Sequence, residues 1–135
     1  MEKEITEIKG GQAMDSLETF KKYRQKMNEK ILASGNKQIK RFFTLDSRAY
    51  EKGALSTKVK ELLGLVASLV LRCNDCITYH IITCVKEGVT PEEFFEAVNI
   101  GLIVGGSIVI PHLRKAVEVY ETCLKMKKEG KELTL

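Results

Sequence analysis

The sequence predicts an all-α protein of six or seven helices, in a single domain that spans residues 1–135. Apolar residues recur at spacings of three and four along most of the chain, and no segment alternates in the manner of a strand. There are only two prolines, and glycines fall where the periodic segments end. A chain of 135 residues is long enough to bury one hydrophobic core.

The first long helix is expected to begin after Asp15 and Ser16, which can cap it, and to end just before Gly35. Residues 1–14 end close to a glycine pair and are expected to form a loose amino-terminal arm. One or two short helices are expected before Gly53. Apolar residues on one face of the first helix are Leu17, Phe20, Tyr23, Met27 and Ile31.

The next helix is predicted to start at a Ser56 or Thr57 cap and to run to about Arg72. It becomes apolar on every side after Glu61, so we expect it to be buried all round. A further helix should span 73–88, with Gly88 as its left-handed terminating residue.

Two more helices follow. The segment "TPEE" at 90–93 is a capping box with Pro91 at the first helical position, and its helix should reach Val104. Gly105 and Gly106 separate it from a last helix over 107–129. Gly101, Gly105 and Gly106 permit either a chain reversal or a close approach of two backbones.

Composition excludes several classes of function. The net charge is only +4, and no basic run is interleaved with aromatics, so we expect no nucleic-acid binding. The longest apolar stretch, "LLGLVASLVL", is about half of the roughly 20 residues that a bilayer span needs. The opening "MEKEITEIKG" does not resemble a signal peptide. We therefore expect a cytoplasmic protein without membrane contact, whose four cysteines lie in a reducing compartment.

The stretch "RCNDCITYH" at 72–80 carries the candidate chemistry. Cys73, Cys76, His80 and Cys84 lie on one helical stripe. A metal site needs ligands that converge on one point, yet Cys73 and Cys84 are about 16 Å apart on a straight helix. The sequence therefore argues against a metal site.

A redox dithiol fits Cys73 and Cys76 better. The amino terminus of a helix stabilises a thiolate, and cysteines three residues apart can form a readily reduced disulfide. His80 lies one turn after Cys76 and can act as its general base. Geometry thus nominates Cys76 as the activated thiolate and Cys73 as its resolving partner.

The remaining candidates have a simpler interpretation. Cys84 and Cys123 lie inside apolar helical patterns and are expected to be small buried hydrophobes. His112, which follows Pro111 at the start of the last helix, is expected to be a hydrogen-bonded core or interface residue. A functional role for His112 stays open.

Glu61 followed by the Cys73–Cys76 pair and His80 resembles the core motif of alkylhydroperoxidase D-like proteins, of the carboxymuconolactone decarboxylase superfamily. The resemblance covers most of 36–125. It implies a compact helical bundle that assembles into trimers or hexamers and needs no bound cofactor. It also implies a peroxide-attacking Cys76, a resolving Cys73, and a proton relay formed by His80 and Glu61.

Two points qualify this resemblance. In a plain helical hairpin, Glu61 would lie about 7 Å beyond His80 along the axis, so its relay role depends on the resemblance. Well-known members often carry a histidine where this chain has Asp75. A carboxylate there disfavours a thiolate at Cys76, although it could instead cap the helix.

The sequence thus predicts a thiol-dependent peroxidase, or disulfide oxidoreductase, that reduces hydroperoxides with electrons from an external dithiol, and the resemblance implies that this donor is of the lipoyl type or another thiol. One alternative is a lactone decarboxylase-like enzyme with His80 and His112 as acid and base. Another is a non-enzymatic redox-sensing oligomer. A homo-oligomer is expected on any of these hypotheses, because the chain offers more apolar surface than it can hide.

Overall fold

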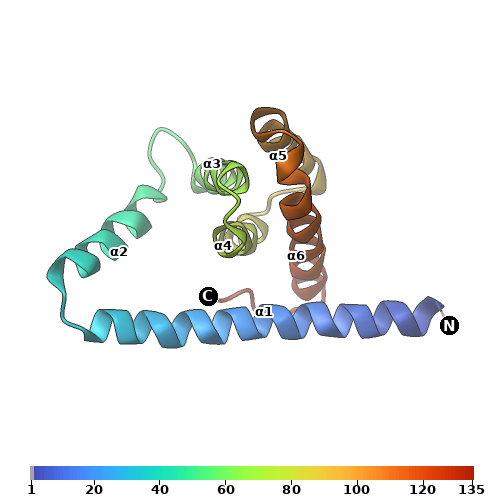
Figure 1. Cartoon of the computed structure of the whole chain (residues 1–135), viewed down its shortest axis with the longest axis horizontal. Coiled ribbons are helices and arrows are strands. Elements are labelled where there is room, and N and C mark those ends of the chain that lie inside the picture. Colours follow the sequence, from blue (N-terminus) through green and yellow to red (C-terminus); the bar gives the residue numbers. More distant parts are fainter. Residues whose placement is uncertain (1) are drawn as a thin grey trace. The chain divides into compact units, whose positions relative to one another are not determined.

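The computed structural model describes the backbone of residues 2–135 and the side chains from residue 10 onward. In this part of the chain we find six α-helices, one short 3₁₀ helix and no strand, which confirms the predicted all-α class (Figure 1). None of these helices is long and apolar enough to cross a membrane. The elements are α1 (Glu2–Ala33), α2 (Lys37–Ala49), α3 (Thr57–Val70), α4 (Asn74–Lys86), α5 (Pro91–Gly105), η1 (Ser107–Val109) and α6 (Ile110–Lys128).

The chain divides into two compact units. One holds α1 and α2 and ends at Glu51, with Leu135 grouped with it, and the other spans Lys52–Thr134 and holds α3 to α6. Within the second unit, α3 packs against α4 and α5, and α4 packs against α6 (Figure 1). All candidate site residues lie in the second unit. A single domain over 1–135 stays a prediction.

The expected loose arm over residues 1–14 is wrong for the described residues, because α1 already begins at Glu2. Met1 lies outside the described chain. The glycine pair falls inside the helix, where each glycine costs about 1 kcal/mol relative to alanine. The residues on both sides of the pair are mostly good helix formers, so the helix continues. Asp15 is therefore an interior residue rather than a cap, and its carbonyl accepts a hydrogen bond from the Thr19 hydroxyl at 2.9 Å.

The prediction that α3 is buried on every side is also wrong. Leu65 and Leu69 are buried, but Leu63 on the opposite face is 55% exposed. The reason is that α4 and α5 cover only part of the helix surface. Together with α5, the uncovered side of α3 lines a shallow apolar groove of about 570 Å³. We call it the α3–α5 groove; its lining residues are Val59, Leu62, Leu63, Val66, Ala67, Val70, Leu71, Ala97, Ile100 and Val104.

The core of the second unit holds its helices at close range. Phe94 of α5 stacks on Tyr120 of α6 with ring centroids 4.0 Å apart, and the Tyr120 hydroxyl donates to the Val89 carbonyl at 2.9 Å. Burial raises the pKa of this Tyr120 hydroxyl. A β-carbon placed on Gly101 would lie 2.9 Å from Leu69 Cδ2, so α5 approaches α3 more closely than any side chain allows. Of the two roles considered for these glycines, Gly101 serves close approach.

Helices α3 and α4 end in the same hydrogen-bonded turn, built on different residues. At the end of α4, Gly88 has φ +79°, and Val89 N–H donates to the Cys84 carbonyl. At the end of α3, Arg72 takes the equivalent place with φ 60°, and Cys73 N–H donates to the Ser68 carbonyl. A left-handed conformation costs a residue with a β-carbon about 1–2 kcal/mol. The turn before the cysteine pair is therefore strained, and the turn after α4 is not.

Candidate functional site

Cys73 links the two helices of the site. Its backbone N–H closes the turn after α3, and its side chain caps the amino terminus of α4. The Cys73 Sγ accepts the backbone N–H of Cys76 at 3.2 Å. A sulfur in this position lies at the amino terminus of α4, where the helix dipole is positive. Negative charge on the Cys73 sulfur is therefore stabilised there. The predicted capping role of Asp75 is wrong, because Cys73 holds the cap and Asp75 lies in the first turn.

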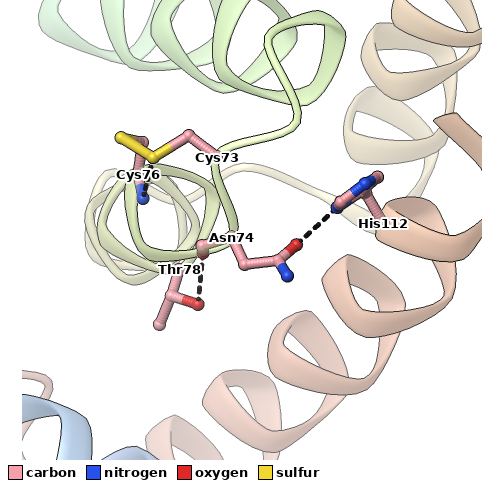
Figure 2. The surroundings of a disulfide bond; sticks show 5 residues. All are labelled: Cys73, Asn74, Cys76, Thr78 and His112. Carbon is pink, nitrogen blue, oxygen red and sulfur yellow. Dashed lines mark hydrogen bonds between the residues drawn. A yellow bond between two sulfur atoms is a disulfide. The ribbon is translucent and has the colours of Figure 1, made fainter.

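Cys73 and Cys76 form a disulfide, with Cα atoms 5.3 Å apart (Figure 2). This separation lies within the range of ordinary disulfides. The two cysteines differ in access, since Cys76 is exposed and Cys73 is half-buried. We therefore expect an external reagent to reach Cys76 more readily than Cys73.

Glu61 and His80 form a buried pair. The Glu61 Oε2 lies 2.7 Å from His80 Nδ1, and the two residues are only 2% and 8% exposed. The gap of about 7 Å expected from a plain hairpin is closed by the way α3 packs on α4. With the carboxylate accepting from Nδ1–H, Nε2 carries the lone pair of the neutral ring. His80 lies one turn after Cys76 on the same helix, and its second ring nitrogen is chemically able to accept a proton.

His112 contacts the first turn of α4. Its Nδ1–H donates to the side-chain Oδ1 of Asn74 at 2.7 Å, and both residues are half-buried (Figure 2). The sequence favoured a hydrogen-bonded core or interface residue here, and the structure shows that its partner lies between the two cysteines. No sequence signal could have revealed the contact, because 38 residues separate the partners. Only the packing of α6 on α4 brings them together.

Cys84 and Cys123 lie apart from the disulfide, and both are buried. Burial raises the pKa of the Cys84 thiol to about 12, with a further contribution from the charge of Glu61. A thiol with such a pKa remains protonated at neutral pH and is a poor nucleophile. This agrees with the structural role predicted for Cys84 from its apolar neighbours.

The described side chains include no group of three or more histidines, cysteines or carboxylates arranged to hold a metal ion. The four residues on the predicted stripe separate into different environments. Cys73 and Cys76 are joined to each other, His80 is paired with Glu61, and Cys84 faces the core. The arrangement provides a dithiol with a neighbouring buried carboxylate–imidazole pair, which is chemistry suited to thiol exchange and proton transfer.

Comparison with known proteins assigns this arrangement to a family. The sequence profile of the carboxymuconolactone decarboxylase family matches residues 39–119, more than half of the chain. The chain belongs to the carboxymuconolactone decarboxylase family. Its predicted place among the alkylhydroperoxidase D-like members is confirmed by the fold and by the structural relatives. The matched segment contains all four predicted site residues.

The relatives of this family member include solved structures. A family protein of Thermotoga maritima, with a suggested part in an antioxidative response, is 54% identical with a TM-score of 0.83. The match covers 87% of this chain and 99% of that one. A family protein of Legionella pneumophila is 28% identical with a TM-score of 0.70, over 82% of this chain and 96% of that one. Protein 4 of the cox locus of Paracoccus denitrificans is 28% identical over 80 residues, 59% of this chain and 72% of its own length.

Proposed function

We propose that this protein is a thiol-dependent peroxidase that reduces hydroperoxides and is regenerated by an external dithiol. The observation that carries the proposal is the buried Glu61–His80 pair, placed one helical turn after the exposed Cys76 of a cysteine pair. The antioxidative role suggested for the Thermotoga relative supports the same class of reaction.

In the first step, the reduced Cys76 transfers its thiol proton to His80, which Glu61 orients and balances electrostatically. The Cys76 thiolate attacks the terminal peroxide oxygen, and the O–O bond breaks. Cys76 becomes a sulfenic acid, and the leaving alkoxide takes the proton from His80 and departs as an alcohol. Two electrons thus pass from sulfur to the peroxide.

In the second step, the Cys73 sulfur attacks the Cys76 sulfur, the S–S bond forms, and hydroxide leaves and is protonated to water. An external dithiol, for example a lipoyl-type donor, then attacks the exposed sulfur of Cys76. Cys73 is the leaving group, and its position at the amino-terminal cap of α4 stabilises the departing thiolate. The second thiol of the donor then attacks the donor–Cys76 mixed disulfide and expels the Cys76 thiolate, so the donor leaves as a disulfide and the cysteine pair is reduced again.

This cycle uses only the cysteines and a carboxylate–imidazole pair, so the proposal includes no bound cofactor. We place the protein in the cytoplasm, where the reducing environment keeps thiols such as those of Cys73 and Cys76 in the reduced form. Nucleic acid and membranes are not among the proposed partners.

We also propose that the chain forms a homo-oligomer, a trimer or hexamer. The α3–α5 groove is almost entirely apolar, and Ile100 and Val104 are among the exposed residues that line it. Exposed apolar surface of this kind is commonly covered by another subunit. Light scattering of the purified protein tests the proposal, and a monomeric mass at micromolar concentration would contradict it.

The peroxidase is tested by following the consumption of an organic hydroperoxide with dihydrolipoamide as the donor. We expect Cys76→Ser to abolish turnover, because serine cannot form the sulfenic acid. The matched control is Cys84→Ser, which changes a buried cysteine of the same helix and should retain turnover. Unchanged turnover in the Cys76→Ser variant would refute the assignment.

A further inference from the structure

The hydrogen bond between His112 and Asn74 lies next to the disulfide but takes no part in the cycle described above. His112 belongs to the first turn of α6, and Asn74 is the first residue of α4. In Figure 2 the Asn74 side chain projects from the first turn of α4 toward His112, away from the two sulfurs. The contact therefore reaches the cysteine pair only through the backbone of that turn.

Asn74 is held on two sides. Its side-chain oxygen accepts from His112 Nδ1 at 2.7 Å, and its backbone carbonyl accepts from the Thr78 hydroxyl at 3.0 Å (Figure 2). The second bond lies within α4, so it moves with the helix. The first bond ties the turn to a different helix and fixes its position in the second unit.

We propose that His112 is a positioning residue for the dithiol: through Asn74, it holds the first turn of α4 in the geometry that closes the Cys73–Cys76 disulfide. This inference rests on the proposed function, in that it takes the cysteine pair to be a working redox couple. When the disulfide is present, the covalent bond itself fixes the turn. When it is open, the contact between His112 and Asn74 keeps the two sulfurs within reach of each other.

The direction of the effect follows from this difference. Loss of the contact allows the reduced turn more conformations and leaves the oxidised turn almost unchanged. The reduced form is therefore favoured, and the sulfurs have a lower effective concentration toward each other. We expect the equilibrium constant for disulfide formation to fall about three- to tenfold, the worth of one such hydrogen bond. The reduction potential should rise by about 15–30 mV, the same ratio for a two-electron couple.

The experiment equilibrates the full-length chain with mixtures of reduced and oxidised glutathione and counts the protein thiols. The variants are His112→Leu, which replaces the imidazole with an apolar side chain of similar size that cannot donate a hydrogen bond, and Asn74→Ala, which suits the first position of a helix. We expect each variant to shift the equilibrium by the stated factor. The double variant should shift it no further than either single variant, because both remove the same contact.

The chain offers a matched control. Lys127 of α6 donates to the Val85 carbonyl at 2.9 Å, so it ties the same two helices together at the opposite end of α4. We expect Lys127→Met to lower thermal stability to a similar degree as His112→Leu and to leave the glutathione equilibrium unchanged. A merely structural role of His112 would make the two variants behave alike.

Two results would overturn the proposal: equal shifts in the His112→Leu and Lys127→Met variants, or additive shifts in the double variant. The readout needs no peroxide. A wild-type protein that forms its disulfide but does not reduce peroxide would thus refute the proposed function and leave this inference standing. Circular dichroism shows whether His112→Leu is folded like the wild type. If it is not, the glutathione equilibrium of the Asn74→Ala variant tests the proposal instead.

Discussion

The two ends of α4 carry cysteines of opposite character. At the amino end, Cys76 is exposed, Cys73 caps the helix, and the preceding turn is strained at Arg72. At the carboxyl end, Cys84 is buried among apolar side chains. The following turn is unstrained, because a glycine, Gly88, adopts its left-handed conformation. The residue type is the same at both ends, so its chemistry is decided by access, helix polarity and desolvation.

The largest expected contrast is in alkylation. After reduction of the disulfide, we expect iodoacetamide at pH 8 to modify Cys76 about a thousandfold faster than Cys84. An ordinary thiol has a pKa near 8.5, so about a quarter of it is thiolate at pH 8. Burial raises the pKa of Cys84 to about 12, which leaves very little thiolate there. Peptide mapping by mass spectrometry measures both rates, and similar rates would break the comparison.

The next contrast concerns proton transfer. We expect His80→Gln to lower peroxide turnover about a hundredfold or more, the usual contribution of a general base. The control is Cys84→Ala, because Cys84 lies one turn after His80 on the same helix. This variant should keep turnover near that of the wild type. Stopped-flow measurement of sulfenic acid formation at Cys76 locates the loss in the first step. A His80→Gln variant with normal turnover would exclude His80 as the base.

How far the sequence predicted this site depends on how local each contact is. The Cys73–Cys76 pair and the position of His80 follow from helical spacing, and the glycine that ends α4 and the capping box of α5 follow from their residue types, whereas the Cys73 cap of α4 was missed. The pairing of Glu61 with His80 needed the packing of α3 on α4, and the family resemblance anticipated it where spacing did not. The contact between His112 and Asn74 depends on a helix that starts 36 positions further along the chain than α4, and no pattern predicted it.

The same physics explains the errors in the fold. Hydrophobic content predicted that α3 would be buried on all sides, but content does not say how many neighbours a helix has. The glycine pair in α1 predicted a break, but a break needs a competing structure that is more stable than the helix. Both errors arise because tertiary packing overrides local propensity, and the sequence pattern does not reveal which helices pack against each other.

A smaller effect concerns pH and the buried end of α4. The pKa of Cys84 is raised in the folded protein from 9.0 to about 12, so between these values the folded state binds more protons than the unfolded one. The contribution of Cys84 to the free energy of unfolding should therefore be constant below pH 9 and fall between pH 9 and 12. We expect Cys84→Ala to reduce this slope, leaving the part due to Tyr120. Urea titrations at several pH values measure it, and identical slopes would contradict the assignment.

The smallest effect compares the two turns that bracket α4. Arg72→Gly should raise the free energy of unfolding by about 1 kcal/mol, because glycine adopts φ 60° without strain. Gly88→Ala should lower it by a similar amount, because alanine must adopt φ +79°. Denaturation by guanidinium chloride measures both. Changes of the same sign would show that the left-handed conformation is not what distinguishes the two turns.

The pairing of Glu61 with His80 also has a consequence for the order of folding during synthesis. The partners are only 19 residues apart, while His112 lies 38 residues from Asn74. Short loops close at lower entropic cost, and the amino-terminal parts of a chain leave the ribosome first. We therefore expect the contacts between α3 and α4, with both cysteines in place, to form before α6 packs against α4. We expect the dithiol of a nascent chain to be the last part of the site to acquire its final redox properties.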